Sequence, residues 1–309
     1  EISTTADGSI TFKNDGQLDV NAKITADGNI VQNGDGSIVL NEDIFTSNDL
    51  VEFLQNVLLS GDRSIDTSTN PGTGAGGTIR FVKDVNGGGN SLTLVTPGTS
   101  GDVEIEGKAH NLNTLTISNA RDVTLQNVEI AGAVDITAQR MANLEGDLTT
   151  ANSSVTLRVN DLVLTGSIDS GTADVQIRPA TITQEIRLGS GGSGGGALHI
   201  SDLEFDKIAT SGQLTIGAGV HTGKIRVTGA ISPANATGGF RIVNGGNGIE
   251  IGADITYNGA GAAGDLTLTA NGGGSTTGAI TDADPGSLFE IRAKNLTLNA
   301  ATGIGTSGS

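Results

Sequence analysis

The sequence predicts an all-β fold, a right-handed parallel β-helix (β-solenoid) with about 20 residues per turn. Three observations carry this prediction: a repeat of apolar residues, many glycines without a collagen period, and short stretches in which apolar and polar residues alternate. Three apolar rows at one period indicate three short strands per turn, each turn stacked on the last. The rows are Leu115, Val134, Val155, Val175, then Val123, Leu144, Leu162, Ile182, and then Val128, Leu148, Ile168, Leu188.

The composition agrees with thin stacked layers and excludes several classes of function. The 309 residues include 48 glycines, 5 prolines and only 3% aromatic residues, so the core must be aliphatic. A net charge of −17 opposes binding to nucleic acid or to an anionic membrane. The absence of cysteine excludes disulfides, thiolate zinc sites and cysteine nucleophiles. No apolar run is long enough for a transmembrane helix.

The first 44 residues read as short strands separated by corners. Ile10 and Phe12 alternate with polar residues, as do two later pairs, which is typical of half-buried strands. Asp-Gly pairs lie between these strands and supply the left-handed backbone conformation that tight turns need. They are Asp7-Gly8, Asp15-Gly16, Asp27-Gly28 and Asp35-Gly36. We expect them at corners between parallel strands.

Residues 46–60 are the exception. Apolar residues in this stretch fall on one helical face, and Thr46 with Asp49 fits a capping box, so we expect a short helix near 47–56 that covers an end of the coil. The alternative is an irregular insertion or two strands, since Val57 and Leu58 lead into a Gly-Asp corner.

The rest of the chain returns to short strands, so residues 1–309 are expected to form one elongated β-solenoid segment. A Gly/Ser stretch at 189–196 is expected to be a flexible loop. Crossovers between parallel strands are right-handed. At about 4.8 Å per turn the segment would be a rod roughly 70 Å long. Because the chain starts at Glu1, without an initiator Met or a signal peptide, we expect a segment of something longer.

Several phrases resemble the repeats of filamentous-haemagglutinin-like proteins, which are large, repetitive bacterial exoproteins. They are GGTIRF at 76–81, NSLTL at 90–94, GDVEI at 101–105, RDVTL at 121–125 and KNLTLNAATGIG at 294–305. This resemblance covers most of the chain except residues 46–56. It implies a secreted, surface-attached β-helical stalk used in adhesion, aggregation or cell-to-cell contact, and it supplies no catalytic motif.

Calcium is the one ion that the acidic composition suggests. Asn33, Asp35, Gly36 and Glu42 match part of an EF-hand loop, but Val31 occupies the first ligand position. The sequence GGNGIE at 245–250, with Glu250 in the position of the aspartate, is a broken copy of a calcium-binding nonapeptide. We therefore take Asn33, Asp35, Glu42 and Glu250 as weak calcium candidates and expect no required cofactor.

The sequence indicates a catalytic site even less than it indicates a calcium site. Asp102, Asp122 and Asp161 lie on or near strands and are the acid/base candidates of a carbohydrate-active enzyme. His110, His199 and His221 lack metal spacing and are expected at the surface or at strand edges. Basic residues recur through the middle block, where they form either a basic ladder or charges that protect strand edges. They are Lys83, Arg121, Arg140, Arg158, Arg178 and Arg187.

Together these features predict a secreted or bacterial cell-surface protein that is structural or adhesive and not an enzyme. Its partner would be a host or neighbouring-cell surface, through carbohydrate or protein. One alternative is a self-assembling extracellular filament subunit that associates end to end. The other is a β-helical lyase or hydrolase.

Overall fold

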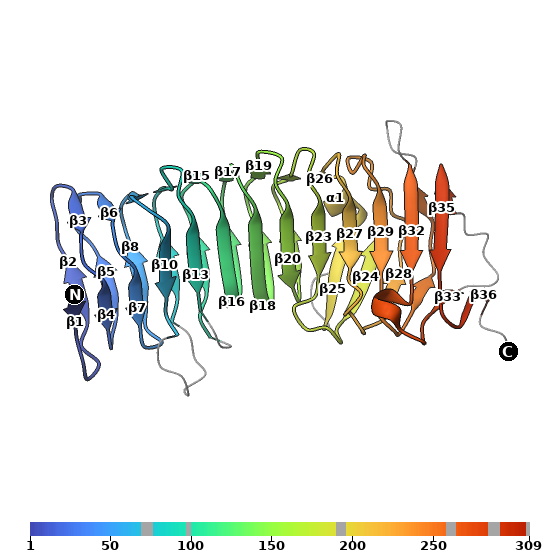
Figure 1. The fold of residues 1–309 in the computed structure, drawn as a ribbon, viewed down its shortest axis with the longest axis horizontal. Helices are drawn as coiled ribbons and strands as arrows, with labels where there is room; N and C mark the ends of the chain where they lie inside the picture. Colours follow the sequence, from blue (N-terminus) through green and yellow to red (C-terminus); the bar gives the residue numbers. More distant parts are fainter. Residues whose placement is uncertain (69–76, 97–99, 190–195, 258–263, 284–290, 307–309) are drawn as a thin grey trace. The chain divides into compact units, whose positions relative to one another are not determined.

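The computed structural model describes residues 1–68, 77–96, 100–189, 196–257, 264–283 and 291–306. It confirms the predicted fold class: short parallel strands stack coil upon coil as a parallel β-helix (Figure 1). The chain divides into two compact units, residues 1–151 and 152–309. Most of the stretch expected to be a Gly/Ser loop, residues 190–195, lies outside the described residues.

Each coil of the first unit contributes three strand segments, as the three apolar rows predicted. The first series is β1 (Ile2–Ser3), β4 (Ile24–Ala26), β7 (Ile44–Thr46), β10 (Arg63–Asp66) and β13 (Leu92–Val95). The second is β2 (Ile10–Phe12), β5 (Ile30–Gln32), β8 (Val51–Phe53), β11 (Ile79–Phe81) and β14 (Val103–Ile105). The third is β3 (Leu18–Val20), β6 (Ile38–Leu40), β9 (Val57–Leu59), β12 (Val85–Asn86), β15 (Ala109–Leu112), β17 (Val128–Ile130) and β19 (Leu148–Thr150).

In the last two coils of this unit the first two segments join into one long strand. These strands are β16 (Leu115–Leu125) and β18 (Val134–Leu144). Their register shifts between Ile117 and Ala120, and Asn119 there has a φ of +57°, which bends the strand into a corner. Asn tolerates this left-handed conformation better than most residues.

Aliphatic side chains form continuous columns inside the first unit. One column follows the strand register through six coils, from Ile24 and Ile44 to Ile65, Leu94, Ile117 and Ile136. Each of these side chains is at most 1% exposed. Ile24 and Ile44 are twenty residues apart, so the predicted period appears directly as strand pairing. Leu115 pairs with Val134 and Val128 with Leu148, as two of the predicted rows require.

The helix expected near 47–56 is wrong. This stretch contains β8, in which Val51 and Phe53 face inward and Glu52 faces out, and β9 follows directly. Coil stacking decides the conformation here, because Val51 pairs with both Ile30 and Ile79. The one α-helix of the described residues is a single turn elsewhere, α1 (Asp202–Phe205), which begins at a capping box formed by Ser201 and Glu204.

The second unit has longer coils. One sheet series is β20 (Val155–Val159), β23 (Val175–Arg178), β27 (Leu214–Gly217), β29 (Phe240–Val243), β32 (Asp265–Thr269) and β35 (Asn295–Asn299). A second sheet contains β24 (Glu185–Gly189), β25 (Ala197–Ser201), β28 (Ile225–Val227), β30 (Ile249–Ile251), β33 (Ala279–Asp282) and β36 (Gly303–Thr306). Shorter strands are β21 (Leu162–Leu164), β22 (Ile168–Asp169), β26 (Ile208–Ala209), β31 (Ile255–Tyr257) and β34 (Ile291–Ala293). A 3-10 turn covers Gly272–Gly274.

The spacing of twenty residues between paired strand positions ends within the second unit. Two of the predicted apolar rows end there as well. Val155 pairs with Val175 twenty residues later, but Val175 pairs with Leu214, and Leu214 with Phe240. Ile182 is 45% exposed and not in the core, because it lies in the turn between β23 and β24. Leu188 is buried, but it pairs with Ile200 and Val227 instead of continuing the row of Ile168.

Candidate functional site

Charged side chains gather on the outer face of the sheet in the first unit, at positions that alternate with the buried columns. Glu52, Arg80 and Glu104 are aligned across three coils by the register of β8, β11 and β14. Arg80 is the centre of this group: its Nη1 lies 2.8 Å from Glu52 Oε1 and its Nε 3.3 Å from Glu104 Oε2. A third carboxylate, that of Glu106, lies 2.6 Å from Nη2.

These contacts shift the pKa values of the group. Hydrogen bonds to Glu106 and Glu52 raise the pKa of the Arg80 guanidinium, which therefore stays fully charged. The pKa of Glu104 is raised, mainly by burial, with a contribution from neighbouring carboxylates that the charge of Arg80 opposes. This group therefore lies at the surface as a compact acidic cluster around one cation.

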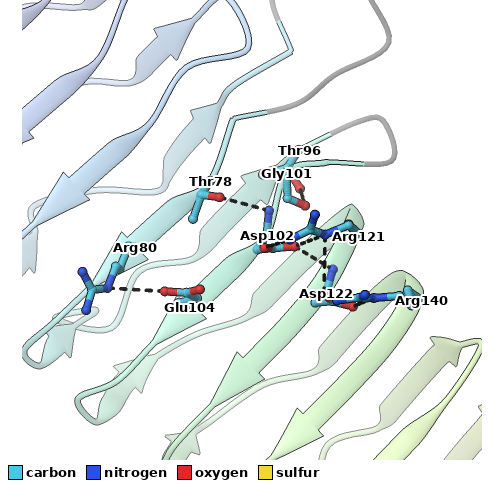
Figure 2. Close-up of polar contacts among 9 residues, drawn as sticks. All are labelled: Thr78, Arg80, Thr96, Gly101, Asp102, Glu104, Arg121, Asp122 and Arg140. Carbon is cyan, nitrogen blue, oxygen red and sulfur yellow. Dashed lines mark hydrogen bonds and ion pairs between the residues drawn. The ribbon is translucent and has the colours of Figure 1, made fainter.

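A second row of charges crosses the neighbouring coils (Figure 2). It consists of Asp102, Arg121, Asp122 and Arg140, and we call it the Asp-Arg ladder. Arg121 Nε donates to Asp102 Oδ1 at 2.9 Å, and Arg140 Nε donates to Asp122 Oδ1 at 2.7 Å. In both pairs Nη2 contacts the second carboxylate oxygen, so each pair is bidentate. Arg121 Nε also lies 3.5 Å from Asp122 Oδ2, which links the two pairs into one row.

The coil period produces this ladder. Arg121 follows Asp102 by 19 residues and Arg140 follows Asp122 by 18, so each arginine lies one coil beyond the carboxylate that it binds. The backbone N–H of Asp122 also donates to Asp102 Oδ1 at 3.2 Å. Hydrogen bonds to these carboxylates raise the pKa values of Arg121 and Arg140.

The structure thus brings together two of the three aspartates proposed as acid/base candidates. Both are held by guanidinium groups that contact both carboxylate oxygens. A carboxylate held in this way links adjacent coils, because its partner arginine belongs to the next coil. Asp161 lies in the other unit, just before β21.

Comparison with protein-family models, curated proteins and solved structures finds no match to this chain. The fold and the contacts of the described residues therefore carry the functional argument.

The calcium candidates do not form a common site. Asn33 and Asp35 lie in the turn between β5 and β6, and Glu42 is an exposed residue beyond β6. Glu250, on β30, is bound by Lys224 Nζ at 2.7 Å and by Arg226 Nη1 at 2.6 Å. The described residues contain no group of three or more His, Cys, Asp or Glu side chains that could hold a metal ion. Calcium binding at these four residues stays a prediction.

A buried amide that the sequence analysis missed organises the turn after β5. Gln32 is fully buried, and its Nε2 donates to Asn14 Oδ1 at 3.0 Å and to the carbonyls of Gly34 and Gly36 at 2.9 and 3.0 Å. A side chain at Gly36 would collide with the carbonyl of Gly16 in the coil before, 1.8 Å away. The signal was present in the sequence, since Gln32 occupies an inward position of an alternating strand.

The histidines lie in different environments. His110 is on β15 and His199 on β25, both partly exposed. The expectation of a surface or strand-edge position is wrong for His221, which is 1% exposed in the loop after β27. Its peptide N–H donates to the carbonyl of Ala218 and its carbonyl accepts from Gly245, so the backbone fixes it inside. Burial, together with the charge of Arg178, lowers the pKa of His221 to about 4.

The basic residues do not form one continuous ladder. Arg121 and Arg140 belong to the Asp-Arg ladder, and Lys83 is exposed in the turn after β11. In the second unit Arg158 is aligned with Arg178, and Arg187 Nε lies 2.7 Å from Glu185. The cations of these ion pairs contact carboxylates on the same or an adjacent strand. Among the described residues no helix is long and apolar enough to cross a membrane.

Proposed function

We propose that this chain is a structural segment of a secreted or bacterial cell-surface protein, a stiff β-solenoid that mediates attachment or cell-to-cell contact. The observation that carries this proposal is the pairing of outward charges from coil to coil above a continuous aliphatic core. Side chains arranged in this way hold neighbouring coils in register. The resemblance of the repeats to filamentous-haemagglutinin-like exoproteins supports the same conclusion.

Stiffness follows from three kinds of contact that act along the coil axis. Parallel strands bond each coil to the next through their backbones, inward side chains pack in columns, and outward ion pairs bridge successive coils. Each coil depends on its neighbours only, so a stack can be long without a larger core. Such a stack presents extended faces and corners, which suit contact with a surface.

An attachment assay tests the proposal. Beads coated with the full chain are flowed over bacterial and host-cell layers, and the retained fraction is counted. Beads coated with the Leu148→Asp variant, which places a charge in a core column, are the matched control. We expect retention by the folded chain and its loss with the variant. Equal retention of both kinds of bead, or retention of neither, would contradict an adhesive solenoid.

The same preparation tests the enzymatic alternative. Incubation with acidic polysaccharides, followed by measurement of reducing ends and of unsaturated sugar products, should show no turnover. Turnover that is lost in Asp102→Asn or Asp122→Asn would instead make the Asp-Arg ladder part of an active site and would refute the structural assignment.

A further inference from the structure

An open groove of about 420 Å³ lies on the outer face of the second unit, across β20, β23, β27 and β29. Its floor is one register row: Thr156 pairs with Gln176, Gln176 with Thr215, and Thr215 with Arg241. Asp174 and Gln213, which come just before β23 and β27, line it as well. Its volume falls in the range of small-molecule sites, about 300–1,000 Å³.

The groove lies where the length of the coil changes. Thirty-nine residues separate the paired residues Val175 and Leu214, against twenty between Val155 and Val175. The additional residues form β24, β25 and α1. The loop that starts at Gly217, which has a φ of +84°, forms one wall with Ala218 and Gly219. Gln176 Nε2 donates to the carbonyl of Gly217 at 3.2 Å and so ties the floor to this wall.

Arg241 is the one cation among the residues that line the groove. Its Nη1 donates to Gln213 Oε1 at 3.1 Å, and among the described residues it forms no ion pair. The carboxylate of Asp174 accepts from the backbone N–H of Gln213 at 2.8 Å. By contrast, Arg80, Arg121 and Arg140 are all bound to carboxylates. The remaining donors of the Arg241 guanidinium therefore suit an anionic group of a ligand.

We propose that this groove binds an extended, mostly neutral polysaccharide that carries isolated carboxylates. Arg241 would hold a carboxylate in bidentate fashion, and the hydroxyl groups of Thr156 and Thr215 with the amide of Gln176 would bind sugar hydroxyls. The inference names a ligand class for the attachment role and rests on that proposed function.

Charge and geometry select this class over others. Three gaps between strands at about 4.8 Å each give a row of polar side chains roughly 14 Å long, enough for an extended oligosaccharide. A densely sulfated or phosphorylated polymer is disfavoured, because the chain carries a net charge of −17 and the groove lining offers a single cation. A peptide strand is disfavoured because the floor presents side chains and not an open strand edge.

Titration with fluorescent oligosaccharides tests the inference, using the full chain. The probes are hyaluronan oligosaccharides, which have one carboxylate in every second sugar, the same oligosaccharides with their carboxylates reduced to alcohols, and heparin oligosaccharides. We expect hyaluronan to bind more tightly than the other two. Arg241→Gln should weaken hyaluronan binding by about tenfold or more and leave binding of the reduced probe unchanged.

Arg140→Gln is the matched control, since it removes the same charge from an exposed arginine of the other unit and should leave binding unchanged. Thr215→Val should weaken both hyaluronan and the reduced probe. Circular dichroism and melting curves confirm that each variant is folded. The inference is overturned if no probe binds, if Arg241→Gln binds hyaluronan as tightly as the parent chain, or if heparin binds most tightly.

The bead assay separates this inference from the proposed function. If oligosaccharides bind through Arg241 but coated beads never attach to cells, the groove assignment holds and the attachment role fails. If beads attach equally with and without Arg241→Gln and no oligosaccharide binds, the attachment role holds and the groove assignment is refuted.

Discussion

Replacing Phe81 by Ala tests whether the inward columns are the main source of stability. Phe81 is fully buried, its ring stacks on that of Phe53 with centroids 5.3 Å apart, and it is aligned with Ile105 in the next coil. Phe-to-Ala changes in cores cost about 3–5 kcal/mol, and the loss of a stacked ring partner places this site toward the upper part of that range. We therefore expect the free energy of unfolding to fall by about 4–5 kcal/mol.

The adjacent residue provides the control. Arg80 lies on the same strand but faces outward, where its ion pairs are partly exposed, so Arg80→Ala should cost only about 1 kcal/mol. Phe81→Leu, which keeps most of the volume, should cost less than about 1.5 kcal/mol. The measurement is urea unfolding followed by far-UV circular dichroism. The dependence of the free energy of unfolding on urea concentration is compared between variants. If Arg80→Ala lowers the free energy of unfolding as much as Phe81→Ala does, the inward columns are not the main source of stability and the reasoning is wrong.

Three further predictions concern the core, the Asp-Arg ladder and the buried histidine. Leu148→Asp should unfold the coils around β19, whereas Thr149→Asp, on the exposed side of the same strand, should change the melting temperature little; equal effects would refute the assigned register. Asp122→Asn should cost about 1–2 kcal/mol in low salt and less in about 1 M NaCl, as urea melts in both solutions would show; a cost that does not depend on salt would contradict the ion-pair account. Because folding lowers the pKa of His221 from 6.5 to about 4, protonation favours the unfolded chain, and stability should fall as the pH drops from 6.5 toward 4, by at most about 3 kcal/mol. Denaturation of the parent chain and of His221→Leu over this pH range should give a flatter curve for the variant; parallel curves would show that His221 titrates normally.

The fold class could be predicted because the contacts of the core run along the coil axis, from each coil to the next. Each inward residue contacts its counterparts one coil before and one coil after, so the sequence period and the contact pattern are the same quantity. Leu115 with Val134, and Val128 with Leu148, are examples. The prediction of a helix at 47–56 was wrong because it used local periodicity alone. Pairing of Val51 with Ile30 and Ile79 is a contact between coils, and it overrides a helical face.

The individual residues of the candidate site were predicted from the sequence, but their pairing was not. The sequence identifies Asp102 and Asp122 as carboxylates near strands and Arg121 and Arg140 as recurring cations. Their separations of 19 and 18 residues are close to the coil period, and this is the signal in the sequence that pairs them. The groove around Arg241 could not be predicted in this way, because it depends on the thirty-nine-residue interval before β27 and on the wall at Gly217, neither of which has a periodic signal.

Most strands pair in parallel with a strand that follows about twenty to forty residues later in the chain, and this has a kinetic consequence. Nearly all native partners of a new coil belong to the coil completed just before it, so closing that coil requires a short loop of chain and no distant segment. A completed edge acts as a template for the strands of the next coil, and order can advance along the polypeptide in step with its synthesis on the ribosome. The first coils to emerge would decide the register of all those behind them.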